Sequence, residues 1–501
     1  MLPTAPLNRL PRPRNLLNWQ MPAEQIQQRP GQPPAPRTHS VCSSRPPSFD
    51  AISYQKLMID TMDSLTQQTA APPIYSRGTV TVSIPANWKS EAGIDTALLV
   101  CALFLQRFSL SFGTSLMSLD VVPALCLLIN QFVAGRLLIV YNRLLWFFVL
   151  GLAATCSLLL NFHITMLPSY SEFMVLYFLF TLSRPSTCER YKSTLQAFQF
   201  LALVLCWLGI AQFLAQFVVD GRKLVNFYNI IPDYLLASYN TGVVNTIIPI
   251  TPASGMIKSN GIFLTEPSTL SQIAALGILI ELLEFRRRLY LLPLSFGFLL
   301  SYSGTGLMTL VLFLPFAGFA RKRMVWYLVL VILFGVGLSV TGLVDFSIFL
   351  ARMGEFQDTH ASGFMRFVAP FWLVPDYLKL VSPRALLLGN GPSTTGAFVN
   401  GIWYSGGVTC TWIKLFYEYG VVGAFVFILF LAACFRRTLC PSVVFVAVLF
   451  TYVFLGGNLL TTPFLILMIV LLTLSAPERR RSHIDTINLH QPFLMTKARE
   501  S

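Results

Sequence analysis

The sequence predicts an all-α polytopic membrane protein with about twelve transmembrane helices and two long loops on one side of the membrane. Hydrophobic residues make up 54% of its 501 residues and charged residues only 12%, which is far more apolar than an average soluble domain. Apolar stretches of roughly 20 residues, the length that crosses a bilayer's hydrocarbon core, recur from residue 95 onward. The formal net charge of +14 follows from membrane orientation and attraction to anionic headgroups, so nucleic acid is not expected as a partner.

Short breaks between the apolar stretches give the order of the helices along the chain. The expected segments are 95–112, 119–135, 144–161, 172–184, 195–219, 267–285, 289–303, 305–320, 325–343, 411–434, 441–456 and 458–474. Together they define a predicted transmembrane domain over 91–475.

Cations mark every second connection between these segments. Lys and Arg favour the cytoplasmic side of a membrane, and the remaining short connections hold almost none. The cationic positions are Arg136, Arg143, Arg184, Arg190, Lys192, Arg286, Arg287, Arg288, Arg321, Lys322, Arg323, Arg436, Arg437, Arg479, Arg480 and Arg481. An even number of crossings then puts both termini in the cytoplasm.

The two ends of the chain have a different composition. Residues 1–90 hold fourteen of the 31 prolines and few periodic apolar positions, which predicts a disordered cytoplasmic tail. No apolar core of a signal peptide follows the early basic residues, and Met58 or Met62 are alternative starts. Residues 476–501 are expected to form a basic cytoplasmic tail.

Two connections on the outer side are long, 220–266 and 344–410. Loops of this length are usually functional or disordered, and the second alternates aromatic and polar residues as interfacial amphipathic helices do. We therefore expect the chemistry on the extracytoplasmic face, between these loops. The sequence has no CxxC pair, no metal-ligand spacing and no phosphate loop, so neither a cofactor nor a metal is predicted.

Each long loop contains a cluster of polar residues. Lys258, Gly261 and Glu266 supply a cation, a turn and a carboxylate just before an apolar segment, and Arg366 lies in the second loop. Such a cluster suits a lipid-linked substrate that carries a diphosphate, because fixed cations stabilise the negative charge that develops on the leaving group.

These residues resemble a known family. The run from Lys258 to Ser268 is similar to the "R-x-x-G-x-F-x-x-P-N/S" element of the O-antigen ligase and polysaccharide polymerase superfamily. The stretches Ser362 to Arg366 and Leu388 to Pro392 resemble its second outer-loop signature. Trp412 to Gly423 resembles its "H-N-x-x-L-x-x-L-x-E-x-G-x-x-G" helix.

The resemblance implies a metal-independent, inverting glycosyltransferase of GT-C-like architecture in the bacterial inner membrane. Its donor would be an undecaprenyl-diphosphate-linked oligosaccharide, and its partners a flippase and a chain-length regulator in addition to membrane lipids. Lys258 and Arg366 take the positions of the family's first two arginines. The sequence departs from the family in Lys258, in Thr409 where the family usually has histidine, and in Ser303 to Gly306 where it often has a serine-arginine pair. Because of these departures we favour a polymerase of exopolysaccharide or O-antigen over a ligase.

Further residues are candidates for the same site. Arg107, near the outer end of the first segment, is a third diphosphate ligand, or it extends to the outer headgroups. Glu266 is a general base or a partner of Lys258, or it complements the dipole of the helix that follows. Asp358 and His360 are alternative bases, and Gly389 and Gly391 are expected to form a tight turn.

Two other classes of function fit the sequence. A secondary transporter or flippase of a lipid-linked or anionic solute would also have about twelve spans, although the two halves show no repeat. A non-catalytic assembly protein would not need paired polar clusters in its outer loops.

Overall fold

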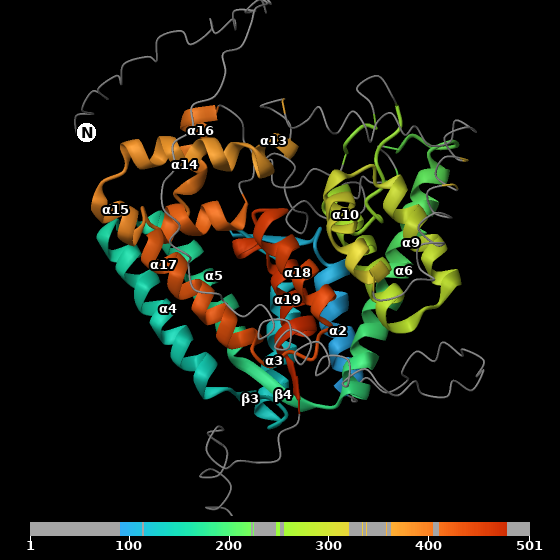
Figure 1. Ribbon diagram of the computed structural model, residues 1–501, viewed down its shortest axis with the longest axis horizontal. Helices are drawn as coiled ribbons and strands as arrows, with labels where there is room; N and C mark the ends of the chain where they lie inside the picture. Colours follow the sequence, from blue (N-terminus) through green and yellow to red (C-terminus); the bar gives the residue numbers. More distant parts are fainter. Residues whose placement is uncertain are drawn as a thin grey trace, which may run out of the picture. The chain divides into compact units, whose positions relative to one another are not determined.

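Helices account for most of the regular structure in the computed structural model (Figure 1). The structure describes residues 91–112, 115–221, 224, 247–250, 255–319, 333, 337, 357, 362–403 and 410–477. The predicted N-terminal tail and all but the first two residues of the predicted C-terminal tail therefore lie outside the described residues, as do most of the expected segment 325–343 and large parts of both long loops.

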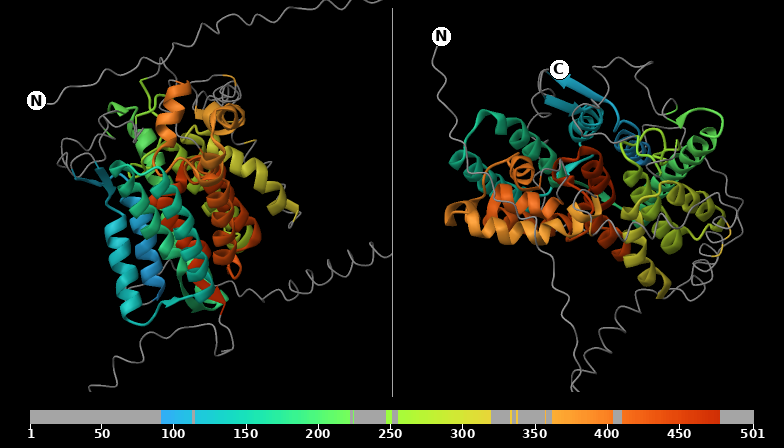
Figure 2. Two further views of the ribbon diagram at one scale, coloured as in Figure 1. Left: turned by 90° about the vertical axis from the view of Figure 1, so that its left-hand side faces the viewer. Right: turned by 90° about the horizontal axis from the view of Figure 1, so that it is seen from above.

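The first part of the described chain contains five helices. They are α2 (Glu91–Phe104), α3 (Val121–Val133), α4 (Tyr141–Leu160), α5 (Leu167–Phe178) and α6 (Cys188–Ala215). The helices between residues 91 and 178 run nearly parallel (Figure 2, left, blue to teal). The expected helix 95–112 is wrong at its end, since α2 stops at Phe104 and the antiparallel hairpin of β1 (Ser109–Phe112) and β2 (Ser115–Ser118) follows.

The second part continues the helical domain. Its apolar helices are α8 (Pro267–Ile280, extended by a π-helical turn over Glu281–Phe285), α9 (Arg288–Leu300), α10 (Gly304–Phe319), α17 (Thr411–Phe435), α18 (Ser442–Phe454) and α19 (Thr462–Met468, extended by a π-helical turn over Ile469–Thr473). By length and composition, five helical stretches can cross a membrane: Tyr141–Leu160, Ile164–Thr181, Cys188–Ala215, Pro267–Phe285 and Thr411–Phe435. The described chain is thus a helical, membrane-embedded domain.

A second small sheet closes one end of this domain. Strand β4 (Leu182–Ser186) pairs antiparallel with β3 (Leu138–Ile139) and parallel with β5 (Ser475–Pro477). Buried Arg143 fastens the same end, because its Nη1 donates to the carbonyl oxygens of Phe180, Leu182 and Thr473 at 3.0 to 3.2 Å. The described domain is mostly helical, as expected for an all-α membrane protein, and the strands at its two ends are short additions to that fold.

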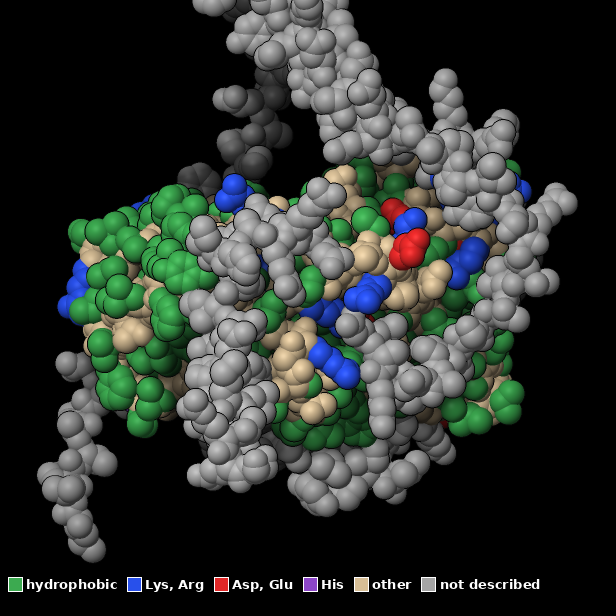
Figure 3. All heavy atoms as spheres, turned by 90° about the horizontal axis from the view of Figure 1, so that it is seen from below, with side chains coloured by type: hydrophobic (Ala, Val, Ile, Leu, Met, Phe, Trp, Pro, Cys, Tyr) green, Lys and Arg blue, Asp and Glu red, His purple; other side chains and the backbone are tan. Residues whose placement is uncertain are grey.

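We call the end that carries β3, β4 and β5 the sheet face. Several connections predicted to be cytoplasmic meet there, since Tyr191 at the start of α6 interacts with Glu284 near the end of the π-helical turn and with Cys440 between α17 and α18. Lys and Arg side chains gather on this face (Figure 3). The grouping agrees with the alternation of cations along the sequence.

We call the opposite end the loop face. It carries the β1–β2 hairpin, the segment 255–266 and four helices, α13 (Ser362–Phe367), α14 (Ala369–Leu380), α15 (Pro383–Leu388) and α16 (Thr395–Trp403). Helix α14 packs against the start of α17, where Tyr377 contacts Phe416 and Tyr417. Its outward side includes Phe371, Trp372 and Leu378, all exposed, as expected for an amphipathic helix at a membrane interface.

Candidate functional site

The segment Ile257–Ser268 is fixed to the loop-face end of α6 and α9. The Ser259 hydroxyl donates to the Gly209 carbonyl at 2.7 Å, and the Ser259 amide donates to the Leu300 carbonyl at 3.1 Å. The Asn260 amide donates to Oε1 of Gln212 at 3.1 Å. The last residues before α8 therefore form a platform that is hydrogen-bonded to two helices.

Gly261 allows the chain to reverse on this platform. Its φ is +69°, and an added Cβ would lie 3.0 Å from the carbonyl oxygen of Leu205. The Asn260 side chain accepts from the Ile262 amide at 3.1 Å and donates to the Leu264 carbonyl at 3.0 Å. A side chain at Gly261 would meet both backbone strain and a close neighbour.

Arg107 contacts this platform from another element, the turn after α2. Its Nη1 donates to the Ile262 carbonyl at 2.6 Å, and the side chain is only 5% exposed. The alternative in which Arg107 extends toward headgroups is therefore wrong. The contact gives Arg107 a positioning role, and its action as a diphosphate ligand stays a prediction.

Glu266 and Arg366 bring the two long loops together. Oε2 of Glu266, the residue before Pro267 of α8, lies 3.9 Å from Nη2 of Arg366 in α13 and accepts a 2.6 Å hydrogen bond from the Ser268 hydroxyl. Both side chains are partly accessible, with exposed fractions of 28% and 12%. The two polar clusters thus face each other, with Glu266 pairing to Arg366.

Lys258 lies on the same platform and is 6% exposed. Arg107 contacts this platform through the Ile262 carbonyl, and Arg366 pairs with Glu266 at its end. Asp358, His360 and Thr409 lie outside the described residues.

Gly389 and Gly391 belong to a second cluster, at the break in α17. Within that helix Gly420 has φ +69° and ψ −174°, so the helix is kinked there. The kink leaves carbonyl groups without helical partners, and the loop satisfies them: the amides of Asn390 and Gly391 donate to the Tyr417 and Glu418 carbonyls, both at 3.0 Å. Irregular backbone at membrane depth needs such internal partners.

Side chains from α4 and α14 complete this cluster. The Ser157 hydroxyl donates to the Glu418 carbonyl at 2.7 Å, and Asn161 donates to the Gly389 carbonyl at 3.1 Å. Asn390 donates to the Tyr377 hydroxyl at 2.9 Å. Burial raises the pKa of that hydroxyl, although the bond from Asn390 opposes the shift. The expected turn at Gly389 and Gly391 thus binds a transmembrane helix.

Asp120 is a buried carboxylate for which the sequence analysis proposed no role. It lies in the turn between β2 and α3, outside the helix, and is fully buried. The Ser118 hydroxyl donates to Oδ1, while Oδ2 has no hydrogen-bond partner in the described part of the chain. Its only signal in the sequence is one acidic residue at the edge of the expected segment 119–135.

Stability should depend on pH through Asp120. Burial raises the pKa of Asp120 from 3.8 to about 6. The hydrogen bond from Ser118 lowers this pKa, but by less than burial raises it. The folded state therefore holds this proton more tightly than the unfolded state, so stability falls as pH rises from about 4 to 6 by an amount on the order of 3 kcal/mol. Asp120→Asn should melt at a higher temperature than the wild type at pH 8, with the gap closing toward pH 4.

Thermal unfolding in detergent between pH 4 and 8 measures this gap. Asp376→Asn, at an exposed position on α14, serves as the control and should show no such trend. A gap for Asp120→Asn that stays constant over the whole range would contradict the assignment.

Comparisons with protein-family models, with curated proteins and with solved structures give no match. Among the residues that the structure describes, no group of three His, Cys, Asp or Glu side chains could hold a metal ion.

Proposed function

We propose that this protein is a bacterial inner-membrane polysaccharide polymerase, which joins undecaprenyl-diphosphate-linked repeat units of an exopolysaccharide or O-antigen at its loop face. The observation that carries the proposal is the meeting of Glu266 and Arg366 across two long loops, at the end of the segment that Arg107 contacts at Ile262. The partly accessible pair of Arg366 and Glu266, at the end of a segment that also carries buried Lys258, suits a substrate with a lipid anchor and a charged diphosphate.

The residues divide the chemistry between them. An acceptor hydroxyl attacks the anomeric carbon, the bond from that carbon to the diphosphate oxygen breaks, and the diphosphate leaves with the bonding electrons. Lys258 and Arg366 stabilise the charge on the leaving group, while Arg107 holds the platform. Glu266 accepts the proton of the attacking hydroxyl, and its pairing with Arg366 is released when the diphosphate takes that cation.

The proposed orientation in the membrane follows from the number of crossings and from the cations of the sheet face. About twelve crossings put both termini on the sheet face, which becomes the cytoplasmic side because it carries the cations. A flippase would then deliver the lipid-linked repeat units, and a chain-length regulator would act on the product. A ligase that transfers the finished glycan to lipid A core is the alternative with the same site.

A transporter is the second candidate, and the buried carboxylates favour it. Asp120 and Glu418 are almost fully buried, and each has one carboxylate oxygen without a partner among the described residues. Proton-coupled transporters use such groups within the membrane domain.

Reconstitution separates these functions. Purified wild-type protein in vesicles with a lipid-diphosphate oligosaccharide should build a glycan ladder without added nucleotide. Lys258→Ala should slow it, because one leaving-group cation is lost. Lys379→Ala, at a 74% exposed position on α14, is the matched control and should keep full activity. Movement of the lipid across the vesicle without ladder formation would overturn the polymerase and support the transporter.

A further inference from the structure

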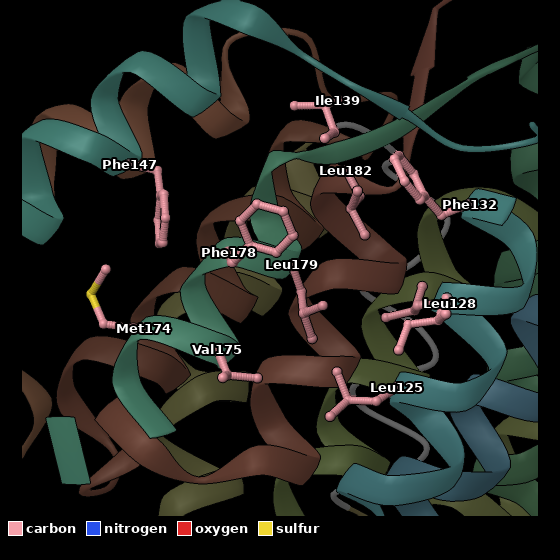
Figure 4. A pocket seen from close by; sticks show the side chains of 11 residues that line it. Leu125, Leu128, Phe132, Ile139, Phe147, Met174, Val175, Phe178, Leu179 and Leu182 are labelled. Atoms are coloured by element: carbon pink, nitrogen blue, oxygen red, sulfur yellow. The ribbon is translucent and has the colours of Figure 1, made fainter. Parts of the chain in front are cut away.

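An apolar groove of about 440 Å³ lies between α3 and α5 (Figure 4). Leu128 and Phe132 of α3 form one wall, and Val175 and Phe178 of α5 form the other. Ile139 of β3 and Leu182 of β4, which pair in the sheet, line its end at the sheet face. Its volume falls in the range of roughly 300 to 1,000 Å³ typical of small-molecule sites.

The groove forms between α3 and α5 because each of these helices packs mainly against other helices. Helix α3 packs against α2 and α19, and α5 packs against α4. Leu128 and Leu182 at the base are buried, while Ile129 and Val175 at the rim are exposed. The opening is therefore lateral, from the surface of the membrane domain, and it suits an extended hydrocarbon chain that enters from the bilayer.

Charge at the two ends of the groove determines which lipid fits. Arg136 lies at the sheet face, in the connection between Phe132 and Ile139, and is exposed. At the loop-face end, Asp120 precedes α3 and Glu172 lies in α5, where Lys414 of α17 offsets part of the negative charge of Glu172. An anionic headgroup is thus attracted at the sheet face and repelled at the other end.

We propose that this groove binds one acyl chain of an anionic phospholipid from the leaflet at the sheet face, with the lipid phosphate beside Arg136. Basic positions next to grooves between transmembrane helices bind anionic headgroups in this way. The site is separate from the proposed glycan chemistry, because the cations of that chemistry lie at the loop face and a diphosphate would meet Asp120 and Glu172 at the near end of the groove.

Native mass spectrometry of the full chain tests the site. The purified protein is mixed in detergent with equal amounts of phosphatidylglycerol and phosphatidylcholine that carry the same acyl chains. The detergent is then removed in the mass spectrometer, and the lipids that stay bound are identified. The wild type should retain phosphatidylglycerol. Val175→Trp, which fills the groove from an exposed position, should lower retention roughly tenfold. Arg136→Gln should lower it about fivefold.

Two control variants make the same kinds of substitution at exposed positions away from the groove. Leu152→Trp changes an exposed position on α4, and Arg190→Gln removes another exposed cation; both should retain lipid as the wild type does. Equal retention of the two phospholipids, unaffected by Arg136→Gln, would overturn the proposal. So would displacement of phosphatidylglycerol by a polyprenyl phosphate that Arg136→Gln does not affect, because the groove would then hold the lipid of the substrate. The ladder assay is independent of all these outcomes.

Discussion

Arg366→Ala should lower the rate of glycan polymerisation by about 100- to 1,000-fold, the loss typical when one preorganised donor to a developing negative charge is removed. The guanidinium is 12% exposed and lies 3.9 Å from its carboxylate partner Glu266, a separation at which their attraction is weaker than in a tight pair. It is thus held in place yet able to turn to a substrate diphosphate. The initial rate of ladder formation in vesicles measures this loss.

Two further variants separate the charge of Arg366 from its shape. Arg366→Lys keeps the charge but loses the planar fork that binds two phosphate oxygens, so its rate should lie between those of the wild type and Arg366→Ala. Arg384→Ala is the matched control, because Arg384 is an arginine of the same loop whose Nη2 donates to the Leu160 carbonyl at 2.8 Å, away from Glu266. If Arg366→Ala and Arg384→Ala lost equal activity, the effect would be one of folding, and the role of Arg366 would be wrong.

Glu266→Gln tests the remaining part of the ion pair. As a general base, Glu266 would contribute about 100- to 10,000-fold to the rate, and the amide cannot accept the proton. If the carboxylate only positions Arg366, the amide oxygen can still accept a hydrogen bond and the loss should be small. A change of less than threefold, roughly 0.6 kcal/mol, would remove Glu266 from the chemistry and leave it a positioning residue.

The sequence predicts where several apolar helices lie, because this depends on composition. Only five described stretches, however, are long and apolar enough to cross a membrane, and the expected twelve crossings are not confirmed. The segment expected at 411–434 is helix Thr411–Phe435, and the one expected at 267–285 ends at Phe285 with its π-helical turn. It does not predict the β1–β2 hairpin. Polar and apolar residues alternate in its strand Ser109–Phe112. Over so few residues this alternation does not distinguish a strand from the end of a helix.

The meeting of the two long loops could be predicted, because alternating cations place both on one face. The pairing of Glu266 with Arg366 could not, since the sequence offered Lys258 as an equally good partner and only the packing of α13 decides between them. The contact of Arg107 with the Ile262 carbonyl is a similar case. A long cationic side chain near a membrane boundary can reach several partners, and its choice depends on the backbone course of the platform.

The hydrogen bonds that join the α15–α16 loop to α17, which we call the lock, could not be predicted from the sequence for another reason. It depends on a backbone break, and the run around Glu418 reads as a continuous apolar helix. The glycines are the only hint in the sequence. In the structure Gly389, Gly391 and Gly420 all have a positive φ, which favours glycine. This geometry makes the lock sensitive to a single added methyl group.

Gly420→Ala should destabilise the protein by several kcal/mol, on the order of 3 or more, and lower the yield of folded protein. An added Cβ would lie 2.4 Å from the Leu387 carbonyl oxygen and 2.5 Å from the Gly389 amide nitrogen. Both neighbours are backbone atoms, so neither can move aside as a flexible side chain would. The φ of +69° adds strain for any residue with a Cβ.

Gly389→Ala should have a similar effect from the other side of the contact, because its Cβ would lie 2.2 Å from the Glu418 carbonyl oxygen at φ +83°. Each variant opens the same interface, so the double variant should lose less than the sum of the single losses. The melting temperature and the monodisperse fraction in detergent measure this. Gly396→Ala, where nothing lies within 4 Å of an added Cβ, is the control and should leave both unchanged. Wild-type stability in Gly420→Ala would mean that α17 runs straight through this position, and the loop at Gly389 would then need another partner.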